Sequence, residues 1–265
     1  MLYALVFAVL VASVSGAPNG GSGRLVGGTQ AARGDYPFVV SISKKDQHIC
    51  GGFIYNDRWV VTAASCIIDE LKADIKVTVG ALSLITPDPE EQIIEVFSNI
   101  TFSGYDRVTK LHDIALIELS RPVVFGDTAQ AIRYDEIDEL ATPWVAAIVG
   151  WGATFPQGTP ATRLRSAPID NLDAECRDYG IDEYQKNYMI CAGSSEGVAP
   201  CEFDEGDPLI QDANYGGIPE RIVVGIMSKN QGCADKTIPS IYTRLATYYS
   251  WLLQNAGQQP AANRV

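Results

Sequence analysis

The chain has 265 residues, of which 46% are hydrophobic and 20% are charged, a composition typical of a globular protein. This length allows one large all-β domain or two small ones with a substantial core. The formal net charge of −12 disfavours nucleic acid and anionic lipid as partners, since both are themselves negatively charged.

The N-terminal segment is apolar over residues 2–14, and small residues follow at 15–17. This run is too short to span a bilayer, so we predict a signal peptide over residues 1–16 and a secreted, extracellular protein. No later segment reaches transmembrane length, and no membrane insertion is expected.

Residues 19–24 are rich in glycine, which predicts a flexible stretch. Residues 1–24 carry one arginine and no acid, so their removal changes the net charge from −12 to −13.

From Phe38 onward, short β-rich runs alternate with turn residues, a pattern typical of an all-β barrel or sandwich. The one segment with helical spacing is residues 247–256, where Tyr248, Trp251 and Leu252 recur on one face before Gly257. The expected strands lie at residues 38–43, 59–65, 75–80, 113–119, 144–152, 221–227 and 240–245.

Six cysteines in a secreted chain predict a disulfide framework, because the extracellular space is oxidising. Six cysteines allow fifteen pairings, and the residues alone do not choose among them. The chain has no C-x-x-C pair and only two histidines, so no metal site and no cofactor are predicted.

Six segments occur in the order in which they are found in the trypsin-like serine proteases (peptidase family S1), and the chain resembles that family from Leu25 to about Ala256. Leu25-Val26-Gly27-Gly28 after Arg24 is similar to the family's zymogen activation site. The other matching segments are Cys50-Gly51-Gly52 with residues 59–66, Asp113-Ile114-Ala115-Leu116, Gly150-Trp151-Gly152, residues 189–193 and Ile241-Tyr242-Thr243-Arg244.

The resemblance implies a domain over residues 25–265 that follows a short activation segment, residues 17–24. Its fold would be all-β, with two perpendicular six-stranded Greek-key barrels at about 25–130 and 131–250 and a C-terminal helix at 247–256. The active cleft would lie between the barrels. The resemblance also implies three disulfides, Cys50–Cys66, Cys176–Cys191 and Cys201–Cys233.

The residues that the family uses for catalysis are largely replaced. Its mechanism needs a hydroxyl nucleophile, an imidazole base and a carboxylate that orients the imidazole. Here Asp113 keeps the carboxylate, but Ser65 stands at the imidazole position and Glu205 at the nucleophile position. Phe203 replaces the glycine whose N–H serves the oxyanion hole, and its side chain is expected to crowd the hole or to change the backbone. We therefore predict an inactive pseudoprotease.

The two histidines are not expected to substitute for the missing imidazole. His112 adjoins Asp113 on an expected strand, where neighbouring side chains point to opposite faces. His48 precedes Cys50 on another run and is interpreted as an incidental surface or edge residue.

The resemblance places the specificity pocket at four positions, and the acid that would select lysine or arginine is absent from them. The equivalent of the family's calcium loop, residues 80–92, begins with Ala81 where an acidic ligand would be expected, so no calcium is predicted. The pocket equivalents are Ala199, Ser228, Asn230 and Ser240.

The activation elements are retained. In the family, cleavage after the residue equivalent to Arg24 frees an amine that pairs with the aspartate equivalent to Asp204. We therefore expect an activating trypsin-like protease to cut between Arg24 and Leu25, since a buried carboxylate without a cation is costly.

Two short motifs remain. Asn99-Ile100-Thr101 is an N-glycosylation sequon, so Asn99 is a possible acceptor. Arg33-Gly34-Asp35 spells the integrin-binding tripeptide, but its place before Tyr36-Pro37-Phe38 favours an ordinary polar turn.

Two functions follow from these replacements. The first is a secreted non-catalytic homologue that binds an extracellular protein as a cofactor, decoy or regulator in proteolysis or defence. The alternative is a hydrolase that uses Asp113 and Glu205, since two nearby carboxyls can divide the roles of acid and base, as in glycosidases.

Overall fold

The computed structural model describes residues 28–138, 146–171, 176, 184–193, 199–215, 218–230, 233 and 239–259. The predicted signal peptide, the activation segment and the Arg24–Leu25 junction lie outside these residues.

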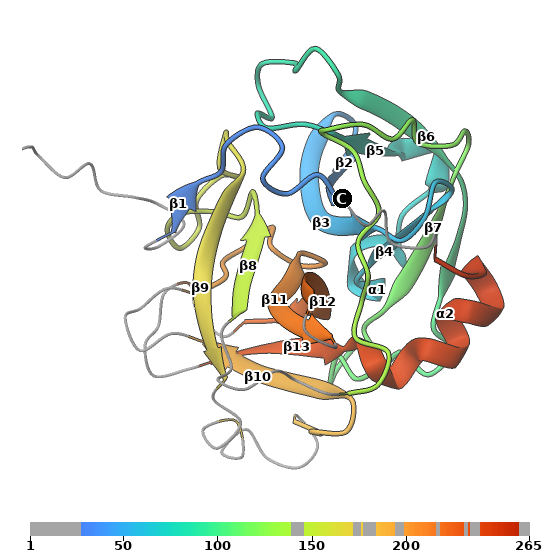
Figure 1. The fold of residues 1–265 in the computed structure, drawn as a ribbon, viewed down its shortest axis with the longest axis vertical. Helices are drawn as coiled ribbons and strands as arrows, with labels where there is room; N and C mark the ends of the chain where they lie inside the picture. Colours follow the sequence, from blue (N-terminus) through green and yellow to red (C-terminus); the bar gives the residue numbers. More distant parts are fainter. Residues whose placement is uncertain are drawn as a thin grey trace, which may run out of the picture.

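The N-terminal half of the described chain forms a closed antiparallel barrel (Figure 1). Strand β5 alternates buried and half-buried residues, with buried Ile75, Val77 and Val79 on one face. The strands follow the order β2-β3-β4-β7-β6-β5 around the barrel. They are β2 (Val39–Lys44), β3 (Gln47–Ile54), β4 (Trp59–Thr62), β5 (Ile75–Val79), β6 (Gln92–Thr101) and β7 (Ala115–Leu119).

The C-terminal half forms a second barrel beside the first (Figure 1). Its sheet runs in the order β1-β9-β10-β13-β12-β11-β8, and pairing of β8 with β9 closes six of these strands. The short strand β1 adds to the outside of β9, with Thr29 opposite Ser166. The strands are β1 (Thr29–Gln30), β8 (Ala146–Gly150), β9 (Arg165–Asn171), β10 (Met189–Gly193), β11 (Pro208–Tyr215), β12 (Ile218–Lys229) and β13 (Ser240–Arg244). Two six-stranded antiparallel barrels with a C-terminal helix confirm the predicted fold class.

The C-terminal helix α2 (Tyr249–Ala256) follows a 3-10 turn, Leu245–Tyr248, so the predicted helix 247–256 begins two residues later than expected. The helix returns to the first barrel, where Figure 1 shows it beside β7. Tyr55 Oη donates to the Gly257 carbonyl at 2.7 Å, and Asn56 Nδ2 donates to the Ala256 carbonyl at 2.9 Å. These two bonds join the end of the chain to the turn between β3 and β4.

Two expected strands are shorter than predicted. The run 59–65 ends as a strand at Thr62 and continues into a short helix, α1 (Ala64–Ile67), because the Ser65 N–H bonds to a carboxylate and not to a neighbouring strand. The run 113–119 is a strand from Ala115 only, which leaves Asp113 in the preceding loop.

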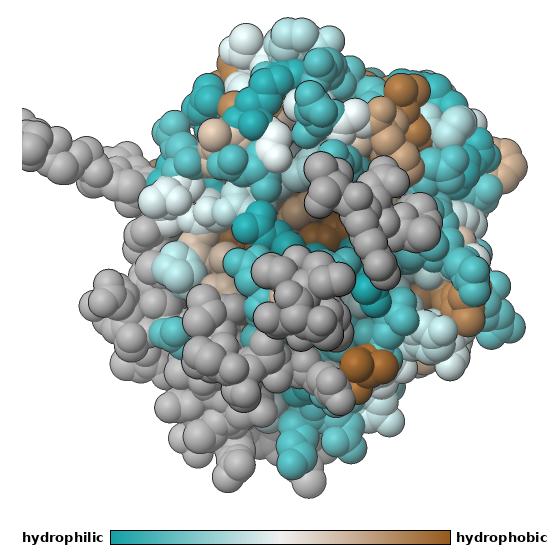
Figure 2. All heavy atoms as spheres, in the orientation of Figure 1, coloured by the Kyte–Doolittle hydropathy of each residue, from teal (hydrophilic) through white to brown (hydrophobic). Residues whose placement is uncertain are grey.

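Side chains from both barrels form one buried cluster that includes Phe53, Trp151 and Val223. The candidate site is built on segments that end over this cluster. On the face drawn in Figure 2, hydrophilic side chains predominate among the coloured atoms, and apolar side chains appear as separate groups. Among the described residues, no helix combines the length and the apolar character that crossing a bilayer requires.

Candidate functional site

Asp113 is the centre of a buried hydroxyl network. Its side chain is fully buried, and its Oδ1 accepts the Ser65 backbone N–H at 2.7 Å. Its Oδ2 accepts the hydroxyls of Ser65 at 2.9 Å and Ser228 at 2.7 Å, while Thr243 Oγ1 donates to the Asp113 carbonyl at 2.8 Å. Burial raises the pKa of the carboxyl, and the bonds from Ser65 and Ser228 oppose that rise. Asp113 therefore joins α1, β12 and β13 through hydroxyl groups.

A hydroxyl stands where the resemblance would place an imidazole. Ser65 donates both its N–H and its Oγ–H to the carboxyl of Asp113. A serine hydroxyl is a negligible base near neutral pH, so Ser65 cannot take a proton from a nucleophile as an imidazole would.

The Glu205 side chain folds back onto its own loop. Its Oε2 accepts the Phe203 backbone N–H at 3.1 Å, and its carboxylate also accepts the N–H of Glu205 itself. The N–H groups at these two positions form the oxyanion hole in the family that the chain resembles. The carboxylate at the nucleophile position therefore takes up the donors that would stabilise a substrate oxyanion.

Phe203 keeps a left-handed backbone conformation, with φ at 73°. A non-glycine residue in this region costs about 1–3 kcal/mol, so the surrounding loop must hold it there. Both its polar backbone groups are bonded, since its N–H reaches Glu205 and its carbonyl lies 3.2 Å from His48 Nε2. The Phe203 N–H is therefore present, and the Glu205 carboxylate occupies it.

Because of the Glu205 carboxyl, we expect the stability of the folded protein to decrease as pH rises. Burial is the main cause that raises its pKa from 4.5 to about 7. The native state therefore binds this proton more tightly than the unfolded chain, so the free energy of unfolding falls as pH rises from about 4.5 to about 7. In thermal melts across this range, E205Q should lose this component of the decrease.

The matched control is E95Q, which changes an exposed glutamate on β6. Asp204, Asp207 and His48 titrate in every variant, so the difference between the wild-type and E205Q profiles reports Glu205 together with its effect on the neighbouring carboxyls. Superimposable profiles for these two proteins would contradict the assigned environment.

His48 is not the surface or edge residue that was expected. Its side chain is 8% exposed, and its Nδ1 lies 2.8 Å from Ser41 Oγ. Its ring packs against Trp151 with centroids 5.8 Å apart. Burial lowers its pKa to about 4, so the ring is neutral at physiological pH. The prediction was wrong because His48 lies on the same face of β3 as buried Cys50, where the Phe203 carbonyl contacts its Nε2.

His112 also differs from its expected setting. It lies in a turn with φ at 58°, and not on a strand, so alternation does not apply to it. Its Nδ1 lies 2.8 Å from the Tyr248 hydroxyl, and its ring packs against Tyr188 and Phe102. The side chain is therefore part of an aromatic cluster beside helix α2.

Asp204 and Asp207 form a buried acidic pair. Asp204 accepts the N–H groups of Gly152 and Cys201, each at 2.8 Å. Burial raises the pKa of Asp204 to about 6 and that of Asp207 well above its ordinary value, with the neighbouring Asp204 charge adding to the second shift. Both shifts favour the protonated form of Asp207 beside the Asp204 carboxyl, since two buried neighbouring carboxylates repel one another.

Asp207 was overlooked in the sequence, although the signal was present. The family pattern has a second glycine where this chain has Asp207. Its carboxyl fills the space between two glycines, because a Cβ built on Gly51 or Gly150 would lie 1.5 Å from an Asp207 oxygen. This close fit shows that the glycines and the aspartate depend on one another.

The four pocket equivalents do not share one role. Ala199 and Ser240 are buried, and Ser228 is bonded to Asp113. Asn230 is half-buried and its Nδ2 has no hydrogen-bond partner in the described structure. Residues 194–198, 231–232 and 234–238, which the pocket would also need, lie outside the described residues.

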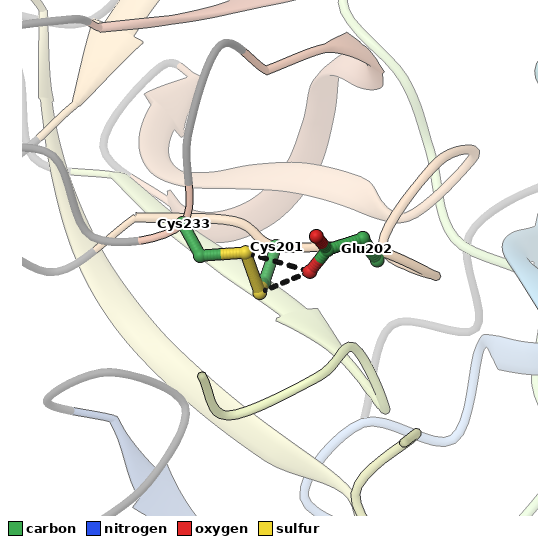
Figure 3. Close-up of side chains that lie close together, drawn as sticks. All are labelled: Cys201, Glu202 and Cys233. Carbon is green, nitrogen blue, oxygen red and sulfur yellow. Dashed lines mark hydrogen bonds between the residues drawn. A yellow bond between two sulfur atoms is a disulfide. The ribbon is translucent and has the colours of Figure 1, made fainter. Parts of the chain in front are cut away.

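The three disulfides join Cys50 to Cys66, Cys176 to Cys191 and Cys201 to Cys233, the pairs that the resemblance implies. Figure 3 shows the Glu202 carboxylate beside the last of them, with Oε2 2.8 Å from Cys201 Sγ and 2.7 Å from Cys233 Sγ. Within the described residues this is the one close group of three metal-ligating side chains. Disulfide sulfurs carry no proton to donate and no thiolate charge, so the oxidised group is no ready metal site.

The tripeptide Arg33-Gly34-Asp35 is held within the chain. Arg33 pairs with Asp88 at 2.8 Å and Glu90 at 3.2 Å, both in the loop equivalent to the family's calcium loop. Asp35 Oδ2 accepts the Ala32 N–H at 2.7 Å, which closes the turn. These bonds favour the turn interpretation, and they place a guanidinium among the loop's carboxylates.

Asn99 lies on β6 opposite Ile117 and is half-buried. Its glycosylation stays a prediction. Arg24 and Leu25 lie outside the described residues, so the partner predicted for Asp204 is not described either.

Comparisons with known proteins agree with this architecture. A family model described as Trypsin matches residues 25–252. The chain is 33% identical over 248 residues to the venom peptide isomerase heavy chain of Agelenopsis aperta, and the match covers 87% of this chain and 99% of that protein. It is 32% identical over 242 residues to trypsin-1 of Astacus astacus, covering 88% of this chain and all of that protein.

A solved structure is similar as well. Neuropsin, a serine protease expressed in the limbic system of mouse brain, superposes with a TM-score of 0.74 at 27% identity, covering 86% of this chain and 98% of that one. Through its ordered motifs, its two barrels and these matches, the chain belongs to the trypsin family.

Proposed function

We propose that this chain is a secreted, non-catalytic member of the trypsin family that binds an extracellular protein as a cofactor, decoy or regulator. One observation carries the proposal: Glu205 stands at the nucleophile position and its carboxylate accepts the Phe203 N–H. Ser65 adds to it, because a hydroxyl has replaced the base. With nucleophile, base and free oxyanion donors all missing, peptide hydrolysis by the family mechanism has no route.

The activity test uses the protein after cleavage at Arg24–Leu25. We expect no labelling by a fluorophosphonate probe and no turnover of peptide substrates, because neither an activated hydroxyl nor a base is present. The alternative, a hydrolase that uses Asp113 and Glu205, is tested with an activated ester. Ester turnover that E205A abolishes would contradict the proposal, whereas equal background rates in both proteins agree with it.

Processing by a trypsin-like protease is part of the same proposal. Asp204 is fully buried, bonded to two backbone N–H groups, and forms no ion pair with a described residue. The amine freed at Leu25 would supply the missing cation. N-terminal sequencing of the circulating protein should therefore begin at Leu25. A form that retains the Arg24–Leu25 bond would refute this part of the proposal while leaving the non-catalytic assignment untouched.

A further inference from the structure

A cavity of about 260 Å³ lies beside strand β1 and the start of β9. None of the triad-equivalent residues lines it. Its walls combine two arginines with neutral polar groups and one aromatic ring, and no carboxylate lines it. The residues that matter here are Gln30, Thr154, Phe155, Thr159, Arg163 and Arg165, which together define the two-arginine cavity.

Arg165 is a buried cation without a counter-ion among the described residues. The residue is 6% exposed, and its Nη2 donates to the Gly28 carbonyl. Its Nε is buried and has no hydrogen-bond acceptor in the described structure. Burial lowers the pKa of this guanidinium, because no described carboxylate compensates for the lost contact with water. A buried charge that is unpaired is costly, so the site favours a ligand that brings negative charge.

Arg163 provides a second cation on the same wall. It is exposed and makes no ion pair with a described carboxylate. Glu202, in the loop that bonds to Ala153, accepts the Gln157 N–H at 3.2 Å and does not line the cavity. The chain has 32 acidic and 20 basic residues, so two neighbouring arginines without carboxylates need an explanation other than scarcity of acids.

We infer that the two-arginine cavity binds one oxyanion group, a carboxylate, sulfate or phosphate. Guanidinium groups recognise such anions through paired N–H donors, and the Thr154 and Thr159 hydroxyls and the Gln30 amide line the same cavity. The volume lies just below the range of about 300–1,000 Å³ that is typical of drug-sized ligands, so it suits a single headgroup or acidic side chain and not a polymer.

The chain's own N-terminal segment is an unsuitable occupant. Residues 17–24 lead toward Gly28 but carry Arg24 and no acid, so they would add positive charge. Phe155 is 52% exposed at the cavity, which provides an apolar contact for a group attached to the anion. An acidic residue of a bound protein and a free inorganic anion share this chemistry, and the experiment separates them.

The test is calorimetric titration of the full secreted chain at low ionic strength with sodium sulfate, with sodium chloride at matched ionic strength as the reference. Wild-type protein should bind sulfate at millimolar concentration or below. Because a charge-assisted hydrogen bond is worth about 1.5 kcal/mol or more, R163Q should bind about tenfold more weakly. R121Q, which changes a surface arginine outside the cavity, should bind as wild type does.

Two further titrations complete the experiment, one with an Arg165 variant and one with a peptide. Arg165 also bonds to the Gly28 carbonyl, so the variant used at this position is R165K, which keeps the charge and should retain the fold and part of the affinity. A short peptide with one aspartate between leucines is titrated in parallel with sulfate. Tighter binding of the peptide would identify a protein-borne acid, and tighter binding of sulfate a free anion. Equal sulfate affinity in wild type and R163Q, or no binding of either probe, would overturn the inference. None of these outcomes depends on whether the chain hydrolyses peptides.

Discussion

The triple variant S65H/F203G/E205S, cleaved after Arg24, should hydrolyse an activated ester at least about 10³-fold faster than the wild-type chain. The variant restores an imidazole beside Asp113, a hydroxyl at the nucleophile position and a free oxyanion donor at position 203. Loss of the base or the nucleophile alone costs about 10⁶-fold in a serine-protease triad, so there is a large range in which to see recovery. The measurement is ester turnover together with labelling by a fluorophosphonate probe.

An activated ester is the right substrate, because Ala199 lacks the charge that would select lysine or arginine. The single variants S65H and E205S should stay at background, since residues of a triad act as a unit. Adding D113N to the triple variant should return ester turnover to the wild-type background by disturbing the imidazole tautomer. Recovery that survives D113N would mean that the measured activity does not use this site.

G150A should lower the free energy of unfolding by about 3 kcal/mol or more, because the cleft side of β8 has no room for a methyl group. The added Cβ would lie 1.5 Å from Oδ2 of Asp207, and the Asp207 carboxyl is fully buried and cannot swing into solvent. Urea denaturation measures the change. In a D207G background the carboxyl is absent, and the same substitution should cost far less.

The control for this cycle is G126A, since a Cβ built on Gly126 has no atom within 4 Å. Its cost should be small and equal in both backgrounds. If G150A were equally damaging with and without Asp207, the two residues would be uncoupled and the close contact between them would not be the cause.

Most of the strands could be predicted from the sequence, and the reasons for the exceptions are physical. β5 and β7 are compact apolar runs that alternate or are buried on both faces, so local patterning identifies them. β3 was expected as the run that carries His48, but its extent was not predicted, because Gly51 and Gly52 at its centre weaken any strand pattern. β11 was missed because polar residues interrupt it, although pairing with β8 and β12 holds it in the sheet.

The sequence located the residues of the candidate site, but it did not predict the hydrogen bonds among them. The family resemblance located Ser65, Asp113 and Glu205, because their neighbours keep the family's order. It could not show that Glu205 bonds to the Phe203 N–H, since that depends on a side-chain rotation in the folded loop. His48 was misjudged for a similar reason: its burial comes from Phe203, which is 155 residues away in the chain. No sequence pattern predicted the two-arginine cavity. The spacing of Arg163 and Arg165 does not show that neither side chain pairs with a described carboxylate.

The bonds between Tyr55, Asn56 and the last turn of α2 have a consequence for how the protein is made. The first barrel is synthesised early, but the groups that complete its turn at Tyr55 and Asn56 are about 200 residues later in the chain. These two bonds can therefore form only after residues 256–257 have been synthesised, although the strands of the barrel close on one another without them. A chain truncated before Ala256 would therefore lack both bonds.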